Sequence, residues 1–325
     1  MTPGQEAGQG WSAPYQADGY HDAGRPLPVE AEQLWEVNAG WWQEAFTAGA
    51  DAEYEEQIIP LLARQLGSVR PGRALDIGCG EGQLSRVAAG VEGTRHVVGI
   101  DPTRSQLSVA LERTGAWVDN GAGAGADAAG GDAAGAGAPR SGQSGATGSG
   151  DDGMSGHETG TVAGARVTYA RASAASLPFA DASFDAAFAC LVFEHIEGTA
   201  GALAEVGRVL VPGGTFVLLL NHPLLQAPGS GWVDDQILGE QYWRIGPYLV
   251  EHHGVEEVDK DVWVPFVHRP LSVYVNAMAD AGLYLTRMEE PAPPEGFLAR
   301  AEEYREAAAF PRLLMLRAEK LARRR

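Results

Sequence analysis

The residues best suited to chemistry form a glycine turn at residues 78–82, where Gly78, Gly80 and Gly82 are spaced two apart. An apolar run before the turn predicts a short buried strand, and a helical pattern follows it. Glycine allows a tight turn and lets a ligand approach the main chain, and the start of the helix offers unpaired N–H groups. Asp76 precedes the turn, and Asp101 ends the next apolar run, where a carboxylate can bind the two hydroxyls of a ribose.

Alternating strand and helix patterns predict the elements that position this turn. The expected fold is α/β, a doubly wound, mostly parallel, seven-stranded Rossmann-like sheet. Its parallel strands are expected at residues 74–77, 96–101, 165–171, 184–190 and 215–221. Residues 283–289 and 312–316 are expected to form an antiparallel pair at the sheet edge.

Composition divides the rest of the chain into flanking and inserted segments. Residues 1–28 are expected to be a disordered tail, residues 29–70 to form N-terminal helices that act as a lid, and residues 71–325 to form the main domain. Two insertions interrupt that domain. Residues 115–165 are rich in Gly and Ala and are expected to be disordered, whereas residues 222–268, after the fifth strand, are rich in aromatic residues and are expected to cover a substrate.

Charge and cysteine content limit the classes of partner and the compartment that the sequence favours. The formal net charge of -19 argues against nucleic acid and against an anionic membrane surface. No apolar run is long enough to span a membrane, and no leader peptide is visible. Cys79 and Cys190 are interpreted as reduced thiols of a cytoplasmic protein. The sequence predicts no metal site and leaves the oligomeric state open.

The glycine spacing distinguishes two classes of nucleotide-binding turn. A nicotinamide site favours G-x-G-x-x-G, whereas here the spacing is G-x-G-x-G and Gln83 occupies the place of the last glycine. Together with Asp76, Asp101, LPF at 177–179, FD at 184–185 and VLVPGG at 209–214, this pattern resembles the class I S-adenosylmethionine-dependent methyltransferases. It is most similar to the small-molecule group that includes the ubiquinone/menaquinone-type C-methyltransferases, and the flanking blocks resemble uncharacterised actinobacterial members. The resemblance covers about residues 70–221 without the insertion.

This resemblance implies S-adenosylmethionine as the cofactor and a small-molecule acceptor. The glycine turn would hold the methionine end, Asp101 the ribose, and Pro102 the adenine. Ser173 stands where the family often has an acid, which leaves that side-chain contact to adenine open. The implied cofactor-binding residues are Asp76, Gly78, Cys79, Gly80, Gly82, Gln83, Asp101, Pro102, Ser173, Ala174, Ala189 and Cys190.

A catalytic base is needed only if the acceptor must lose a proton. Candidates at the carboxyl edge are Glu194, His195, His222, His252, His253 and His268. His222 is favoured by a small margin over His195, because both follow strands and His222 opens the aromatic segment. Expected substrate contacts are Trp41, Trp42, Asn221, Trp232, Tyr242, Trp243 and His268. The acceptor atom (carbon, oxygen or nitrogen) stays open. The alternatives are a non-catalytic S-adenosylmethionine-binding regulator and an NAD-dependent oxidoreductase.

Overall fold

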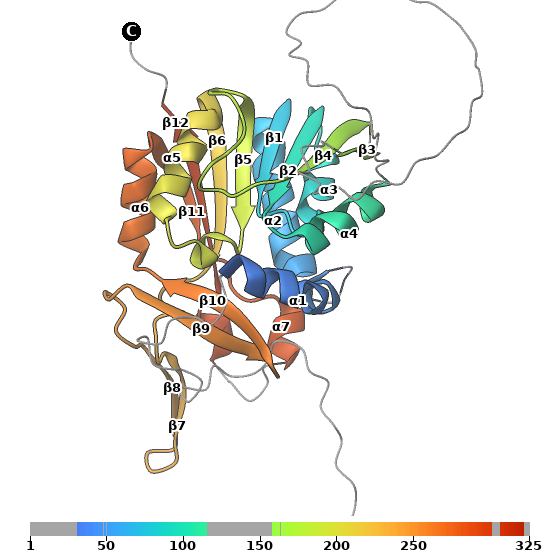
Figure 1. Ribbon diagram of the computed structural model, residues 1–325. Coiled ribbons are helices and arrows are strands. Elements are labelled where there is room, and N and C mark those ends of the chain that lie inside the picture. The colour runs from blue at the N-terminus through green and yellow to red at the C-terminus, as the bar shows by residue number, and fades with distance from the viewer. Residues whose placement is uncertain are drawn as a thin grey trace, which may run out of the picture.

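An eight-stranded sheet forms the centre of the molecule, with the strand order β11-β12-β6-β5-β1-β2-β4-β3 (Figure 1). The computed structural model describes residues 31–47, 49, 51–115, 158–162, 164–300 and 306–321. The strands of the sheet are β1 Arg73–Ile77, β2 His96–Asp101, β3 Glu158–Val162, β4 Ala165–Arg171, β5 Phe184–Cys190, β6 Leu210–Asn221, β11 Leu283–Glu289 and β12 Leu313–Lys320.

The five strands β4, β2, β1, β5 and β6 run parallel, whereas β12 and β11 add an antiparallel pair at one edge. Leaving β3 aside, this is the seven-stranded order 3-2-1-4-5-7-6 of the Rossmann-like methyltransferase fold, so the expected doubly wound sheet is confirmed. β3 pairs antiparallel with β4 and adds an eighth strand. The expectation that residues 115–165 lack structure is therefore wrong for residues 158–162, because pairing along the free edge of β4 orders them.

Helices cover both faces of the sheet and bury two apolar layers. α2 Ile59–Val69, α3 Gln83–Ala89 and α4 Arg104–Thr114 pack on one face, whereas α5 Thr199–Val209 and α6 Leu271–Asp280 pack on the other. Side chains alternate along β5 after the irregularity at Phe184, so that Phe188 faces the first layer while Ala187 and Ala189 face the second. Each fully buried phenylalanine contributes about 2–3 kcal/mol to folding. The two layers hold the carboxyl ends of the parallel strands in fixed register.

A third group of elements lies against the carboxyl edge of the sheet. It comprises α1 Ala31–Phe46, the π-helix η2 Tyr54–Ile58, the 3-10 turn η3 Phe193–His195 and the hairpin of β9 His252–Asp259 with β10 Val262–His268. Figure 1 shows α1 between this hairpin and the sheet. Asn38 connects α1 to β10 of the hairpin, because its Nδ2 donates to the carbonyl of Trp263 at 2.7 Å.

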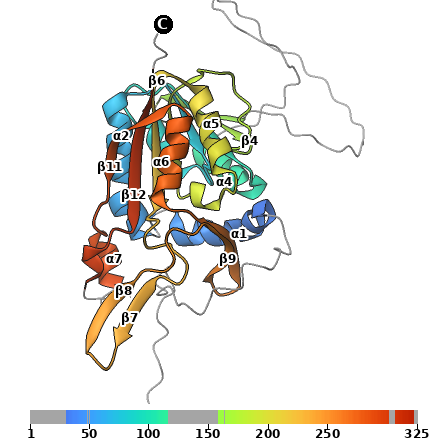
Figure 2. The same ribbon diagram turned by 90° about the vertical axis from the view of Figure 1, so that its left-hand side faces the viewer.

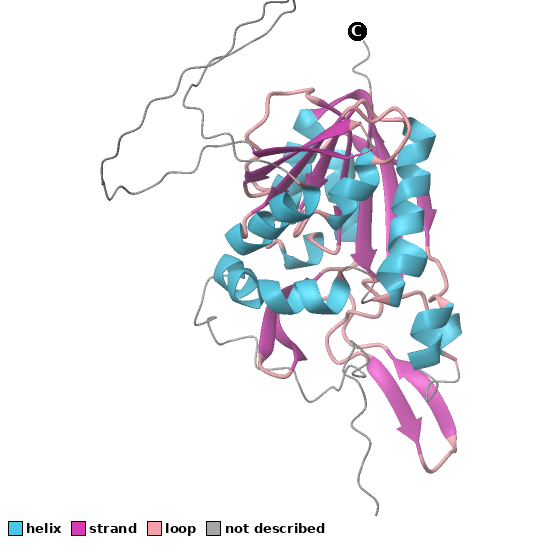
Figure 3. Cartoon of the chain, turned by 90° about the vertical axis from the view of Figure 1, so that its right-hand side faces the viewer, coloured by secondary structure: helices cyan, strands magenta, loops and turns pink. Residues whose placement is uncertain are grey.

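The segment expected as one cover, residues 222–268, forms two separate hairpins. β7 Gly231–Asp235 and β8 Glu240–Arg244 make the other, which extends away from the sheet (Figures 2 and 3). The remaining short helices are α7 Glu295–Arg300 and η4 Ala307–Ala309. Among the described residues, no helix combines the length and the apolar character needed to cross a bilayer. The expected tail at residues 1–28 and residues 116–157 of the insertion lie outside the described residues.

Candidate active site

The glycine turn connects β1 to α3 and leaves one face of its main chain open. All three glycines have positive φ, at +70° for Gly78, +52° for Gly80 and +81° for Gly82. A Cβ atom at Gly78 would lie 2.4 Å from a methyl group of Val192, and one at Gly82 would lie 2.2 Å from the Tyr169 hydroxyl. At Gly80 nothing lies within 4 Å of that position. The first and last glycines are therefore required by packing, and Gly80 presents bare backbone to a ligand.

Asp101 is fixed beside the open face of Gly80. Its Oδ2 accepts a hydrogen bond from the Gly80 amide at 2.9 Å, and its Oδ1 accepts one from the Thr103 amide at 2.8 Å. The residue is 7% exposed, and burial raises the pKa of its carboxyl group. Each oxygen keeps a further lone pair, so the carboxylate can still accept two hydroxyl groups. Pro102, half-buried, follows directly.

Asp76 lies behind the turn and braces it. The residue is 2% exposed, and its Oδ2 accepts a hydrogen bond from the Ser85 hydroxyl at 2.6 Å, which joins β1 to α3. Burial, aided by the nearby charge of Asp101, raises the pKa of Asp76 to about 7. Gln83, expected to bind cofactor, is half-buried beside the turn, and its Oε1 is buried without a partner among the described residues. That oxygen is an acceptor for a ligand at the turn.

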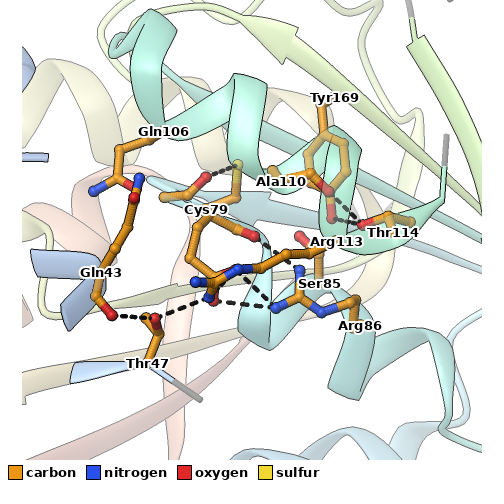
Figure 4. A network of polar contacts seen from close by, with 12 residues as sticks. Gln43, Thr47, Cys79, Ser85, Arg86, Gln106, Ala110, Arg113, Thr114 and Tyr169 are labelled. Atoms are coloured by element: carbon orange, nitrogen blue, oxygen red, sulfur yellow. Dashed lines mark hydrogen bonds and ion pairs between the residues drawn. The ribbon is translucent and has the colours of Figure 1, made fainter. Parts of the chain in front are cut away.

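A chain of polar contacts links the turn to the N-terminal helix (Figure 4). Glu81, which the sequence analysis did not single out, is buried and pairs with Arg86 at 2.8 Å and with Arg113 at 2.9 Å. Arg113 also donates to the hydroxyl of Thr47 at 3.0 Å, and this hydroxyl donates to the carbonyl of Gln43 on α1. α1 is thereby fixed to the same frame as the glycine turn.

The other residues expected at the cofactor differ in exposure. Ser173 is exposed and its hydroxyl accepts the amide of Ala175 at 3.3 Å, while Ala174 is half-buried. Cys79, Ala189 and Cys190 are buried, and both cysteines are free thiols. Burial raises the pKa of the Cys190 thiol well above its ordinary value, which keeps it neutral and unsuited to nucleophilic attack.

A hollow lined mainly by aromatic side chains, here called the aromatic hollow, lies between α1, η2, η3 and the β9–β10 hairpin. Its empty volume is about 590 Å³, open mouth included. Four residues expected from sequence line it: Trp41, Trp42, His195 and Asn221. The others are Trp35, Phe46, Asp51, Glu53, Tyr54, Ile58, Leu191, Gln226, Glu256, Val258, Val264 and Phe266. Tyr54 belongs to the single π-helical turn described, a feature frequent at functional sites that residue patterns do not signal.

His195 presents a neutral imidazole to the aromatic hollow. Its Nδ1 lies 2.6 Å from the carbonyl oxygen of Pro265, which can only accept, so Nδ1 carries the proton and Nε2 carries the lone pair. Trp35 packs edge-on against the ring at 4.8 Å, and Phe266 does so at 5.8 Å. Burial lowers the pKa of His195 to about 4. The ring is thus a proton acceptor at neutral pH.

His222 is not among the residues that line the aromatic hollow, and both of its ring nitrogens are engaged. Its Nε2 pairs with Oε1 of Glu290 at 2.8 Å, and its Nδ1 accepts the amide of Leu224 at 3.2 Å. His222 secures the start of the loop after β6 and has no lone pair left for a substrate. The structure therefore places His195 at the aromatic hollow, and not His222, which the sequence favoured.

The other residues that the sequence predicted as substrate contacts do not line the aromatic hollow. Trp232 and Trp243 face one another across the β7–β8 hairpin and pack against Phe310 at 5.2 and 6.2 Å. Tyr242 is exposed on the same hairpin. His268 is buried and its Nε2 contacts the carbonyl of Tyr248 at 2.8 Å. None of these four lines the aromatic hollow.

The other histidines and Glu194 also differ from the expectation. His252 is half-buried and His253 is exposed beside Glu251, and neither lines the aromatic hollow. Glu194 is 3% exposed, and its Oε1 accepts both the backbone amide and the Nδ2 of Asn221 at 3.2 Å. Burial raises the pKa of Glu194 to about 7. Glu194 orients Asn221, which lines the aromatic hollow.

The two parts of the site fit a nucleoside-bearing cofactor beside a separate acceptor. The open backbone at Gly80, the adjacent Asp101 carboxylate and the unpartnered oxygen of Gln83 suit the ribose and amino-acid ends of S-adenosylmethionine. Cys190 ends β5, and the next residue, Leu191, lines the aromatic hollow. Among the described residues, no cluster of side chains suits a metal ion.

Comparisons with known proteins find methyltransferases. The methyltransferase domain family matches residues 153–218. The O-methyltransferase rstn1 of Aspergillus nomiae is 26% identical over 61% of this chain and 75% of its own length. The O-methyltransferase resE of Aspergillus sclerotiorum is 25% identical over 64% of this chain and 69% of its own length.

Solved structures show the same fold. An S-adenosylmethionine-dependent methyltransferase from Mesorhizobium loti has a TM-score of 0.55 and 26% identity, covering 80% of this chain and 96% of its own. A putative methyltransferase from Listeria monocytogenes has a TM-score of 0.54 and 18% identity, covering 77% and 90%, and supports the fold. These matches set aside the nicotinamide oxidoreductase and the non-catalytic regulator. The chain is an S-adenosylmethionine-dependent methyltransferase, an enzyme that transfers a methyl group to a small molecule.

Proposed function

We propose that the enzyme methylates a hydroxyl oxygen and that His195 removes the hydroxyl proton. The observation that carries the proposal is the contact of 2.6 Å between Nδ1 of His195 and the carbonyl of Pro265, which directs the lone pair to Nε2 in a residue that lines the aromatic hollow. The curated relatives named above, both O-methyltransferases, support oxygen as the target atom.

The chemistry requires a neutral base and a dry, fixed acceptor. S-adenosylmethionine, when bound, supplies a methyl group activated by a positively charged sulfur. The hydroxyl oxygen becomes strongly acidic as it gains the methyl group, so a base with a pKa of about 4 is sufficient to take the proton at Nε2. Trp35, packed edge-on against His195, would help to keep water away from the ring.

Asn221 is proposed to position the acceptor. Its Nδ2 donates to Glu194, which leaves Oδ1 of the same amide as an acceptor group on a residue lining the aromatic hollow. An acceptor hydroxyl could donate its hydrogen bond to Oδ1 of Asn221 or to Nε2 of His195. The lone pairs of the hydroxyl oxygen would then point away from these two atoms and be available to the methyl group. Glu194 acts through Asn221 and does not itself line the aromatic hollow.

On the cofactor side, Asp101 is proposed to bind the ribose hydroxyls, and Gly80 to contact the methionine end. Pro102, Ser173 and Ala174 are proposed to line the adenine. Asp76 would act by holding the turn in shape, because its carboxylate is buried against Ser85.

The likeness to the ubiquinone/menaquinone-type C-methyltransferases and to uncharacterised actinobacterial members is a weaker guide to the target atom. It rests on about residues 70–221, which hold the cofactor turn, whereas most residues lining the aromatic hollow lie outside that range. We therefore propose oxygen rather than carbon. We also propose a cytoplasmic enzyme without a nucleic-acid partner, supported by the two free buried thiols and the net charge of -19.

Transfer of a labelled methyl group from S-adenosylmethionine into cell extract tests the function. The proposal expects labelled methyl ethers or esters, identified by mass spectrometry, with wild-type protein and a strong reduction with His195→Gln. Labelled products that carry the methyl group on carbon alone would contradict it.

A further inference from the structure

We propose that the acceptor carries a cationic amine as well as its hydroxyl, and that the aromatic hollow selects it by this charge. The inference rests on the proposed function, because it assigns the substrate class of the same site. Three independent features of the aromatic hollow lead to it: the arrangement of its aromatic rings, the sign of its charged side chains and a buried oxygen without a donor.

The aromatic rings that line the aromatic hollow pack on one another at several angles. Trp42 stacks on Phe46 with ring centroids 4.3 Å apart and an interplanar angle of 26°. Trp35 meets Trp42 edge-on at 5.7 Å and 79°, and Trp41 meets Phe46 at 5.4 Å and 74°. These rings pack on one another and also line the aromatic hollow. An aromatic ring attracts an ammonium group to any face that stays open to it.

The charged side chains that line the aromatic hollow are all carboxylates: Asp51, Glu53 and Glu256. No lysine or arginine among the described residues lines it. Arg312, outside the lining, balances Glu53, with its Nε 2.9 Å from Oε1. Asp51 is 5% exposed, and its Oδ1 accepts the amide of Tyr54 at 3.0 Å. A carboxylate or phosphate on the acceptor would be repelled here, whereas an ammonium group would be attracted.

Gln226 supplies the third feature. Its Oε1 is buried and accepts no hydrogen bond from the described residues, although the residue lines the aromatic hollow. A buried carbonyl oxygen without a donor is costly, and a ligand that brings N–H groups relieves the cost. An ammonium group carries three such donors and no acceptor.

The methionine end of the cofactor also carries an ammonium group, so the carboxylates that line the aromatic hollow could bind that group instead of the acceptor. The two sources are separated by saturating the protein with S-adenosylhomocysteine, which retains that end and fills the cofactor site. Any charge preference that persists then belongs to the acceptor.

The test is calorimetry of the full chain saturated with S-adenosylhomocysteine. Three phenols of equal ring and similar size serve as probes: 4-(2-aminoethyl)phenol, 4-(2-hydroxyethyl)phenol and 4-hydroxyphenylacetate, with charges of +1, 0 and -1. The amine is expected to bind about tenfold more tightly than the carboxylate, with the alcohol between them. Glu256→Gln should reduce this ratio about threefold, while Glu257→Gln, at the exposed neighbouring position of β9, should leave it unchanged.

Equal affinities, tighter binding of the carboxylate, or no binding of the amine at millimolar concentration would each overturn the inference. So would a preference that disappears once S-adenosylhomocysteine is bound. None of these results affects the transfer of labelled methyl groups to hydroxyl oxygen, so failure of the charge selection is distinguishable from failure of the proposed function.

Discussion

Nδ1 of His195 lies 2.6 Å from the carbonyl oxygen of Pro265, a residue 70 positions later in the chain. This contact crosses from η3, after the fourth parallel strand, to β10 of the hairpin that closes the aromatic hollow. It sets the tautomer of the imidazole, because the carbonyl can only accept. One backbone group thereby decides which ring nitrogen can take a proton.

Replacement of His195 by Gln is expected to lower kcat for a hydroxyl acceptor by about 10²–10⁴-fold, the usual contribution of a general base. Glutamine can keep the donor to Pro265 through its amide but offers no basic nitrogen. Steady-state kinetics measures kcat, and calorimetry with S-adenosylhomocysteine measures cofactor affinity. The affinity should be unchanged.

His222→Gln is the matched control for His195→Gln. Because His222 contacts Glu290 and does not line the aromatic hollow, this variant should retain turnover once its fold is verified by circular dichroism. A large loss of kcat in His222→Gln with normal kcat in His195→Gln would reverse the assignment.

The pH dependence of kcat/KM in wild type and His195→Gln provides a second test of the base. Burial lowers the pKa of His195 to about 4, so the neutral base is present above that pH and is lost as the pH falls through about 4. With an acceptor that does not titrate between pH 4 and 8, the limb of kcat/KM that belongs to His195 should be centred near 4, and a limb near 7 from Asp76 or Glu194, whose pKa burial raises to about 7, should persist in His195→Gln. A limb centred near 6.5, the ordinary value for histidine, that disappears in His195→Gln would contradict the lowered pKa of the ring.

The glycine turn predicts opposite outcomes for two alanine variants. In Gly80→Ala the new methyl group enters open space, so the chain should fold, with a cost of about 1–2 kcal/mol for the positive φ, and bind S-adenosylhomocysteine about tenfold more weakly. In Gly82→Ala the methyl group would meet the Tyr169 hydroxyl at 2.2 Å, so stability should fall by about 1–3 kcal/mol more. Thermal unfolding and calorimetry compare the two, and full cofactor affinity in Gly80→Ala would contradict the open-face interpretation.

Asp76 should make the stability of the ligand-free protein depend on pH. Its pKa rises from the ordinary 3.8 to about 7 on folding, so its stabilising contribution is present below pH 4 and is lost as the pH rises through 7. Asp76→Asn should flatten the corresponding decline in unfolding free energy by at most about 1.4 kcal/mol per pH unit. Urea unfolding at several pH values measures this, with the exposed Asp234→Asn as control. An identical slope in Asp76→Asn and wild type would contradict the buried carboxylate.

The parallel strands could be predicted because each is a short, buried, apolar run with a helical pattern after it. β11 could be predicted too, with the bounds that the structure shows. β3 could not, because Glu158–Val162 follows a long Gly/Ala-rich stretch and becomes a strand only by pairing with β4. Strand formation at such an edge depends on the neighbour and not on local residue type.

The cofactor side and the acceptor side of the site also differ in how far the sequence predicts them. Gly80 and Asp101 follow neighbouring strands, so local patterns assigned both to the cofactor, and the structure shows them in contact at 2.9 Å. The roles of His195 and His222 depend on Pro265 and Glu290, which are distant in sequence. The aromatic residues of the 222–268 segment were expected to act together, but the β7–β8 hairpin extends away from the sheet (Figure 2), and its Trp243 packs on Phe310. Local patterns therefore predicted the position of the glycine turn, whereas the contacts that distinguish His195 from His222 are tertiary.

The central claim is methyl transfer to oxygen with His195 as the base, and single-turnover methyl transfer tests it most directly. Wild-type enzyme and His195→Gln, both saturated with methyl-labelled S-adenosylmethionine, would be mixed with a hydroxyl acceptor identified from extract labelling. The rate of the chemical step should fall by about 10²–10⁴-fold in the variant at equal cofactor occupancy, with the label on oxygen. An unchanged single-turnover rate, or a label on carbon, would contradict the account.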